Sequence, residues 1–336
     1  MLAERFSVAS RSVEIGGKPY VIAEAGSNFN QSRDTALHLI DAAVAAGADA
    51  VKFQLFKASL LYPDGGPVYD VLKSVELNPA WLPSLVDHAK VAGIAFLASA
   101  FDADSLAALE DADVPAHKVA SSEATNAPLL AAMARTGKPI FLATGMCDLT
   151  DVTTALTVIG SEGNRQVSLM QCCSVYPLPE EQANLRVLDT YASAFGGPLG
   201  YSDHTLGRDI AVAALARGAV TFEKHFTLDR SSPGPDHFYA LEPDELTEYV
   251  ATLHRIFAAL GDGAKEMLPQ EQAIGRRVGL HARRPIAAGA RLTAEDLEVR
   301  RPATGIRARD LTLALGTVAR HNIKAGEPLR WTDIRL

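Results

Sequence analysis

Short apolar runs alternate with longer, helically spaced segments along most of the chain. The runs that predict strands cover residues 20–26, 49–56, 94–99, 117–121, 139–145, 166–173, 198–204 and 219–226. The segments that predict helices cover residues 35–48, 80–92, 105–112, 128–137, 151–160, 185–196, 208–217 and 244–261. Because the strand-like runs are almost continuously apolar, they are typical of parallel strands buried on both faces.

The number and order of these elements predict the fold class. Eight strand-like runs separated by helical ones fit a closed (β/α)8 barrel, a TIM barrel, over residues 1–262. A doubly wound open sheet with the same eight strands is the alternative. A polar connector follows over 263–277, and from 278–336 brief strands and Gly turns predict a small β-rich domain. Its phrases RPIAAGARLTAEDL and HNIKAGEPLRWTDI resemble each other and indicate an internal pseudo-repeat.

Composition and charge narrow the class of protein. The net charge of −8 over 336 residues provides no general attraction for nucleic acid or an anionic membrane. No apolar run is long enough to span a membrane, and the N-terminus lacks the apolar centre of a signal peptide. Three cysteines, two of them adjacent, do not form a disulfide framework. We therefore expect a cytoplasmic protein that concentrates positive charge locally if it binds an anion.

Two histidines, His204 and His225, follow or end neighbouring strand-like runs. The C-terminal ends of parallel strands in a strand–helix–strand unit lie close together, so both imidazoles are expected at one mouth, with Asp203 and Asp236. Two neutral imidazoles bind a divalent metal and leave positions open for substrate and water. The pattern predicts an open, catalytic metal site. The alternative is that each is a core histidine, with His204 bonded to Asp203.

Polar residues also follow the other predicted strands, where the active site of such a barrel lies. They include Glu24, Lys52, Gln54, Ser99, Lys118, Ser121, Glu123 and Tyr176. Lys52 and Lys118, with serine hydroxyls and backbone N–H groups, predict a cradle for a small, doubly anionic ligand. The alternative is that the lysines pair with Glu24 or Glu123 and bind no ligand.

Several phrases, in this order, resemble the sialic acid (nonulosonic acid) synthases. They are IAEAGSN, GADAVKFQ, PAHKVASSE, GKPIFLATGM, CCSVYPLP, GYSDHTLG, EKHFTLDRSSPGPDH and LEPDEL. The spacing of 21 residues between His204 and His225 adds to the resemblance, and residues 278–336 resemble the antifreeze-like (SAF) domain of these enzymes. The resemblance implies condensation of phosphoenolpyruvate with an N-acylated mannosamine-type sugar, giving a nonulosonic acid and phosphate with C–O bond cleavage.

The same resemblance implies the chemical roles. His204 and His225 match ligands of a divalent metal ion, with Mn²⁺ favoured over Mg²⁺ or Co²⁺. Glu24 matches an acidic residue implicated in proton handling. From their positions at the strand ends, Glu24, Lys118 and Glu123 are the candidate catalytic residues, and the sequence leaves open whether Glu24 or Glu123 is the acid–base group.

The remaining matches imply substrate contacts. They are Lys52, Ser99 and Ser121 for phosphoenolpyruvate, together with Lys118, and Gln54, Tyr176 and Asp236 for the sugar. Arg301 matches an arginine that the partner subunit's small domain extends to the acyl group of the sugar, which implies a domain-swapped homodimer.

The chain also departs from the family pattern at Phe29, Gln31, Ala143 and Ser174, and RPG has become RPA. These departures leave the identity of the acylated sugar open. The PGPD phrase favours the neuraminate and legionaminate branches. Two rival functions remain: a metal-independent Schiff-base aldolase or lyase with Lys118 as nucleophile, and a non-catalytic sugar-binding relative.

Overall fold

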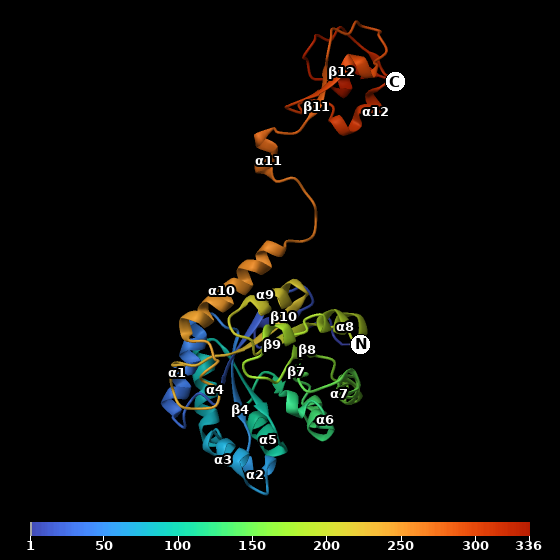
Figure 1. The fold of residues 1–336 in the computed structure, drawn as a ribbon. Helices are drawn as coiled ribbons and strands as arrows, with labels where there is room; N and C mark the ends of the chain where they lie inside the picture. The colour runs from blue at the N-terminus through green and yellow to red at the C-terminus, as the bar shows by residue number, and fades with distance from the viewer. Residues whose placement is uncertain (1) are drawn as a thin grey trace. The chain divides into compact units, whose positions relative to one another are not determined.

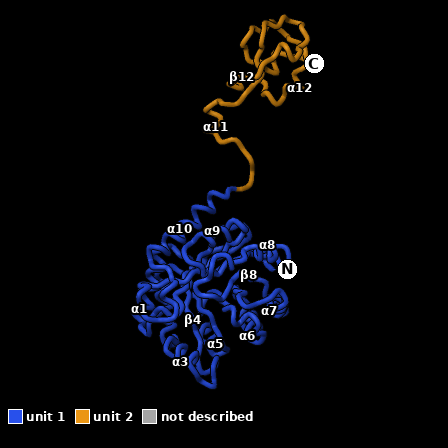
Figure 2. The backbone as a smooth tube through the Cα atoms, in the orientation of Figure 1, with its two compact units in different colours: residues 1–261 blue, residues 262–336 orange. Residues whose placement is uncertain are grey.

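The computed structural model describes residues 2–336, which divide into two compact units between residues 261 and 262 (Figure 2). In the first unit, eight parallel strands close into a barrel in the order β10-β3-β4-β5-β6-β7-β8-β9, with helices outside them (Figure 1). The closed barrel confirms the predicted fold and excludes the open sheet.

Each predicted strand and helix of the barrel is present, with ends displaced by no more than three residues. The barrel strands are β3 (Tyr20–Gly26), β4 (Ala50–Leu55), β5 (Ala95–Ala100), β6 (His117–Val119), β7 (Ile140–Ala143), β8 (Val167–Cys172), β9 (Leu199–Asp203) and β10 (Ala219–His225). The predicted helices are α1 (Arg33–Ala45), α4 (Leu82–Ala92), α5 (Ala103–Asp111), α6 (Ala127–Arg135), α7 (Leu149–Ser161), α8 (Val187–Ala194), α9 (Asp209–Ala216) and α10 (Pro243–Leu260). The β4–α4 connection also contains α2 (Ala58–Leu61) and α3 (Pro67–Ser74), which the apolar pattern did not predict.

Side-chain caps define where several helices begin, and so hold the loops that leave the strand ends. The Asp102 carboxylate accepts from Ser105 N at 2.7 Å and caps α5. Asp148 caps α7 in a reciprocal capping box with Asp151. Because each cap uses otherwise unpaired N–H groups, these loops take a defined course at the mouth of the barrel.

An N-terminal hairpin covers the opposite end of the barrel, and the sequence pattern did not predict it. Strands β1 (Arg5–Val8) and β2 (Arg11–Glu14) pair antiparallel. Phe6 joins a buried apolar cluster inside the barrel, with its ring centroid 6.2 Å from that of Phe141. The Tyr20 ring also stacks on Phe141, with a centroid distance of 5.6 Å. The hairpin therefore forms the floor of the barrel.

The second unit has its own core and two antiparallel strand pairs. It contains α11 (Pro269–Ile274), β11 (Gly279–Ala282), β12 (Leu297–Arg300), α12 (Leu311–Ala314), β13 (Val318–Ala319) and β14 (Ile334–Arg335). Each phrase of the pseudo-repeat contributes an isoleucine to one bridge, Ile286 to Ile323, and then runs through a 3₁₀ turn into a strand. The structural correspondence confirms the internal repeat.

Within residues 2–336, no helix combines the length and apolar character that crossing a membrane requires. Cytoplasmic localisation stays a prediction.

Candidate active site

A small charged pocket, about 50 Å³ in volume, lies at the C-terminal ends of the barrel strands. Its lining residues are Glu24, Lys52, Gln54, Ser99, Phe101, Lys118, Ala120, Ser121, Ala143, Cys172, Tyr176, Ser202, His204, Glu223 and His225. Most residues predicted from the strand ends are thus gathered in one place. Strand register explains the convergence, because Glu24 pairs with Lys52, and Ser99 pairs with both Gln54 and Lys118.

Two lysines and two carboxylates form a buried charge network in this pocket. Lys52 Nζ lies 2.9 Å from Glu24 Oε2 and donates to Ser99 Oγ at 3.1 Å. Glu223 Oε2 lies 3.8 Å from Nζ of both Lys52 and Lys118. From the described residues Glu223 Oε2 accepts no hydrogen bond, so it remains available to a further donor. The suggested pairing of the lysines with carboxylates is therefore present, but Lys118 pairs with Glu223 and not with Glu123.

The two carboxylates of the network differ in proton affinity. Burial, only partly opposed by Lys52, raises the pKa of Glu24. Burial acts on Glu223 in the same direction, but Lys118 and Lys52 together outweigh it and lower the pKa of Glu223. Of the two, Glu24 therefore has the higher proton affinity and is the carboxyl group better suited to take up and release a proton.

The two lysines also differ in proton affinity. Burial would lower the pKa of Lys52, but Glu223 and Glu24 outweigh it, so this pKa is raised. For Lys118 burial dominates over Glu223, and its pKa is lowered. Lys52 is therefore the more firmly charged of the two.

The two histidines face one another across the same pocket, with ring centroids 5.5 Å apart. His204 Nδ1 lies 2.7 Å from the Cys173 carbonyl oxygen. Because a carbonyl can only accept, Nδ1 carries the hydrogen and Nε2 is left with a free lone pair. The alternative in which His204 bonds to Asp203 is not what the structure shows.

Asp203 itself lies outside the pocket, contrary to the expectation that it joins the mouth. Its carboxylate forms a buried ion pair with Lys224 at 2.9 Å. Side chains alternate along a strand, so the residues preceding His204 and His225 point to the opposite side of the barrel wall. There the pair links β9 to β10 directly behind the two histidines.

Burial shapes the protonation of both imidazoles. Burial, partly opposed by Asp236, lowers the pKa of His225 to about 3, so this ring is neutral at physiological pH. Burial alone would also lower the pKa of His204. The neighbouring Cys172 side chain and the Cys173 carbonyl outweigh burial, so the pKa of His204 is raised. A cation at this site would therefore compete with a proton for His204.

The donor set fits a divalent metal with open coordination positions. Two imidazole nitrogens at this ring separation suit one ion with metal–nitrogen bonds of about 2.1 Å. Among residues 2–336 no group of three or more His, Cys, Asp or Glu side chains is arranged to hold a metal ion. The described chain thus supplies two ligands, His204 and His225, and water or substrate would supply the others.

The cradle around Ser121 depends on a glycine. Gly145 N donates to Ser121 Oγ at 2.9 Å. A Cβ atom on Gly145 would clash with Ser174 Oγ and lie 2.8 Å from Ser121 Oγ. Ala143 lines the same side of the pocket. The hydroxyl groups and the backbone therefore lie close enough to surround a small anion only because position 145 has no side chain.

The outer part of the site is aromatic and acidic. The Tyr176 ring centroid lies 4.1 Å from that of His204 and 5.4 Å from that of Tyr239. Asp236 Oδ2 accepts from Ser27 Oγ at 3.2 Å. Asp236 and Tyr176 therefore lie beside the histidines, as the sequence predicted for sugar-contacting residues.

Tyr239 also belongs to this outer part, although the sequence did not point to it. Its hydroxyl donates to Asp236 Oδ1 at 3.0 Å and lies 3.3 Å from His225 Nδ1. Burial, reinforced by Asp236, raises the pKa of Tyr239, so the hydroxyl keeps its proton.

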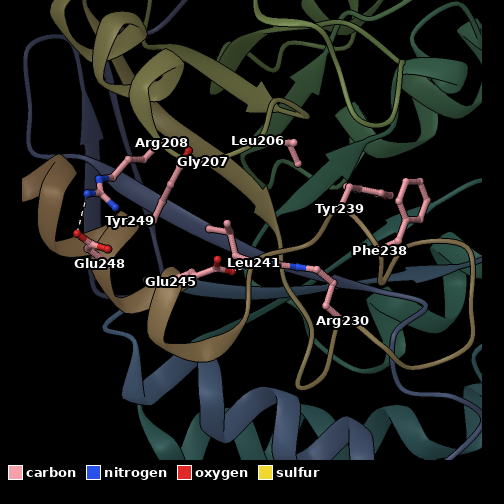
Figure 3. Close-up of a pocket in the computed structure, with 10 residues that line it drawn as sticks. All are labelled: Leu206, Gly207, Arg208, Arg230, Phe238, Tyr239, Leu241, Glu245, Glu248 and Tyr249. Carbon is pink, nitrogen blue, oxygen red and sulfur yellow. Dashed lines mark hydrogen bonds and ion pairs between the residues drawn. The ribbon is translucent and has the colours of Figure 1, made fainter.

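A second pocket of about 350 Å³ lies beside the site, between α10 and the loops after β9 and β10 (Figure 3). Its arginines are already paired, Arg208 with Glu248 at 2.6 Å and Arg230 with Glu245. Tyr239 lines this second pocket, and its ring packs against Tyr176 and His225 of the first.

Besides Asp203, a second predicted residue of the barrel, Glu123, is not brought into the pocket. The Glu123 carboxylate accepts from Asn126 Nδ2 at 2.7 Å, within the turn that precedes α6. Arg301 is exposed in the second unit, just after β12. Glu223, Ser202 and Cys172 line the pocket but were not predicted as functional. For Glu223 a signal existed, because it lies two residues before His225 and so on the same face of its strand.

These features define a (β/α)8-barrel protein with a charged pocket and paired histidines at its C-terminal mouth. Comparison with known proteins agrees: residues 39–265 match the NeuB family and residues 277–335 match the SAF domain. The chain is 36% identical over 336 residues to the N,N'-diacetyllegionaminic acid synthase of Legionella pneumophila, with 94% of each chain covered. It is 35% identical over 304 residues to the N-acetylneuraminate-9-phosphate synthase of Mus musculus, covering 85% of this chain and 84% of that one.

A solved structure supports the same assignment. The N-acetylneuraminic acid synthetase from Leptospira borgpetersenii, in complex with citrate, has a TM-score of 0.77 and 31% identity. The alignment covers 81% of this chain and 95% of that one. The chain belongs to the NeuB family.

Proposed function

We propose that the protein is a metal-dependent synthase that condenses phosphoenolpyruvate with an N-acylated mannosamine-type sugar. The products are a nonulosonic acid and phosphate. The observation that carries the proposal is the placement of two lysines and two imidazoles around one pocket. Membership of a family whose relatives are named as legionaminic and sialic acid synthases supports the same reaction.

The lysines and the serine cradle provide the binding site for phosphoenolpyruvate. Lys52 and Lys118 offer ammonium groups to its carboxylate and phosphate, and Ser99, Ser121 and Gly145 border the same space. In the free protein Glu24 and Glu223 offset both lysines. Since this cluster has little net charge, a divalent cation bound together with the anion would favour binding.

His204 and His225 would hold that cation, with Mn²⁺ the first candidate and Mg²⁺ or Co²⁺ the others. When bound, it supplies Lewis acidity toward the aldehyde of the open-chain sugar. Tyr176, Gln54 and Asp236 orient the sugar above the enolpyruvate, since they surround the outer part of the site. Preorganised lysines offset the negative charge of the reacting anion without rearrangement.

Formation of the carbon–carbon bond comes first. C3 of the enolpyruvate forms a bond to the aldehyde carbon, and the aldehyde oxygen takes a proton, for which Glu24 is the suited donor. Water adds at C2 and transfers a proton back to Glu24. The resulting tetrahedral carbon expels phosphate with cleavage of its C–O bond, and its hydroxyl proton passes to the departing phosphate, leaving the 2-keto acid.

One observation favours a second candidate, the Schiff-base lyase. Burial lowers the pKa of Lys118, which would increase the fraction of neutral, nucleophilic amine. Borohydride reduction in the presence of pyruvate would label Lys118 under this alternative, and chelation would leave the activity unchanged.

Arg301 and the oligomeric state belong to the same proposal. We infer a domain-swapped homodimer in which Arg301 of the partner subunit contacts the acyl group of the sugar. An Arg301→Ala variant would then use the sugar poorly and bind phosphoenolpyruvate normally.

The test is phosphate release from phosphoenolpyruvate with a panel of N-acyl and N,N'-diacyl hexosamines, in Mn²⁺ and then in EDTA. We expect turnover with at least one sugar and its loss on chelation. Phosphoenolpyruvate labelled with ¹⁸O at the bridging oxygen should yield labelled phosphate, as C–O cleavage requires. Absence of phosphate release with every sugar in Mn²⁺ would overturn the assignment.

A further inference from the structure

Tyr239, between β10 and α10, connects two parts of the site that otherwise have separate roles. Its side chain is buried, with the residue only 5% exposed. The ring packs against the His225 ring at a centroid distance of 5.2 Å and against Phe238 at 5.1 Å. These two contacts hold the phenol in position, and Figure 3 shows Phe238 next to Tyr239 in the neighbouring pocket.

The hydrogen bonds of the Tyr239 hydroxyl have a defined direction. The Asp236 carboxylate can only accept, so the phenolic hydrogen points to Asp236 Oδ1 at 3.0 Å. The oxygen of Tyr239 is therefore the acceptor for His225 Nδ1 at 3.3 Å, and Nδ1 must carry a hydrogen. That tautomer leaves the lone pair of His225 on Nε2.

The same logic holds at His204, where a backbone carbonyl takes the place of the phenol. A main-chain carbonyl is fixed by the fold, whereas the partner of His225 is a side chain that also contacts the candidate sugar residue. Of the two imidazoles, only His225 has Tyr239 as its partner at Nδ1, so its orientation depends on the loop that carries Asp236. An outer hydrogen bond of this kind orients a metal-binding histidine and increases its basicity.

We propose that Tyr239 is a positioning residue whose hydroxyl fixes the tautomer and orientation of His225 and couples the cation site to sugar recognition by Asp236. This inference rests on the proposed function only where it names the sugar. The part that concerns cation binding rests on the geometry of the two histidines. The bridge implies that a change at Asp236 alters cation binding through Tyr239, and by linkage cation and sugar binding affect each other by the same factor.

The test uses the full-length Tyr239→Phe variant, which keeps the ring and removes the hydroxyl. Mn²⁺ binding to the substrate-free protein, measured by calorimetry and by the electron paramagnetic resonance of free Mn²⁺, should weaken about 10-fold or more. The KM for the sugar should rise, and the KM for phosphoenolpyruvate at saturating Mn²⁺ should stay within twofold of wild type. Denaturant unfolding of the metal-free variant should match wild type, which separates positioning from folding.

Tyr20→Phe is the matched control. Tyr20 is also a buried tyrosine, at the floor of the barrel, and its hydroxyl has no hydrogen-bond partner among the described residues. Its substitution should leave Mn²⁺ affinity unchanged. Combining Tyr239→Phe with Asp236→Asn tests the coupling, since their effects on Mn²⁺ affinity should be less than additive if both act through one bridge.

The outcomes separate this inference from the proposed function. Mn²⁺ affinity that is unchanged in Tyr239→Phe, or equally reduced in Tyr20→Phe, overturns the inference whatever the activity. A wild-type protein that binds no divalent cation also overturns it. If wild type binds Mn²⁺, the phenylalanine variant binds it weakly, and no sugar is turned over, the inference on His225 holds while the proposed function fails.

Discussion

The two ends of the barrel interior contrast sharply, although the same strands line both. Near the floor the inward positions are apolar and form one cluster with the hairpin. Two residues further along each strand, Ile22 is followed by Glu24, Ala50 by Lys52, and Ala116 by Lys118. The change from an apolar layer to a charged layer thus occurs within a single alternation of the strand.

The contrast shows which interactions each layer requires. The apolar layer is stabilised by burial and needs no particular partner for any side chain. Charges in the upper layer are tolerated because each lies close to an opposite charge, such as Lys52 beside Glu24. The floor therefore contributes stability, and the mouth contributes a preorganised electrostatic environment.

The largest expected effect comes from disrupting the floor alone. Phe141→Ala removes the ring packed against Phe6 and Tyr20 and should lower the free energy of unfolding by about 3–5 kcal/mol. Phe141 pairs with Lys118 in strand register, but its ring belongs to the apolar floor cluster and does not line the charged pocket. Mn²⁺ affinity and KM values of the folded protein should therefore be unchanged. Urea unfolding with steady-state kinetics checks this, and a loss of activity without loss of stability would contradict the division between the layers.

The next effect comes from removing one charge at the mouth. Lys118→Met removes a lysine from Glu223 and from the expected anion, and should lower kcat/KM about 10²–10³-fold. Steady-state kinetics measures this loss, and unfolding measures the cost of leaving Glu223 with Lys52 alone.

A double variant tests whether the loss of charge pairing with Glu223 explains the loss of stability in Lys118→Met. Lys118→Met with Glu223→Gln should recover stability relative to Lys118→Met, since the buried carboxylate is gone, without recovering activity. If stability does not recover, charge pairing does not explain the upper layer.

The smallest effect concerns a buried group outside both layers, His117 on β6. Burial, opposed by Glu110, lowers the pKa of His117 to about 4. The folded state therefore binds fewer protons than the unfolded state between an ordinary histidine pKa of about 6.5 and that value. The contribution of neutral His117 to the free energy of unfolding is fully present above this pH range. It is lost as the pH falls through the range, by about 3 kcal/mol at most.

A His117→Gln variant measures that contribution. Its unfolding free energy should fall less than that of wild type between pH 6.5 and pH 4, with His88→Gln, a more exposed histidine, as control. If the unfolding free energies of wild type and His117→Gln change in parallel with pH, burial does not lower the pKa of His117.

Strand periodicity was sufficient to predict the barrel and most of its mouth, because inward residues at strand ends must converge once the barrel closes. The floor hairpin was missed because two four-residue strands show too little periodicity to distinguish them from a polar start. Glu123 was predicted for the pocket because it follows a predicted strand, but a 3₁₀ turn directs its carboxylate to Asn126. Tyr239 could not be predicted from spacing, since a loop returns it to the site from outside the strand pattern.

The sealed floor has a consequence for how the site is filled. Lys52 and Lys118 lie almost fully enclosed, whereas Tyr176, which lines the same pocket, is exposed. Under the proposed function, phosphoenolpyruvate held by the enclosed lysines would lie beneath the sugar and would therefore load before it. The nonulosonic acid would then leave before the phosphate beneath it.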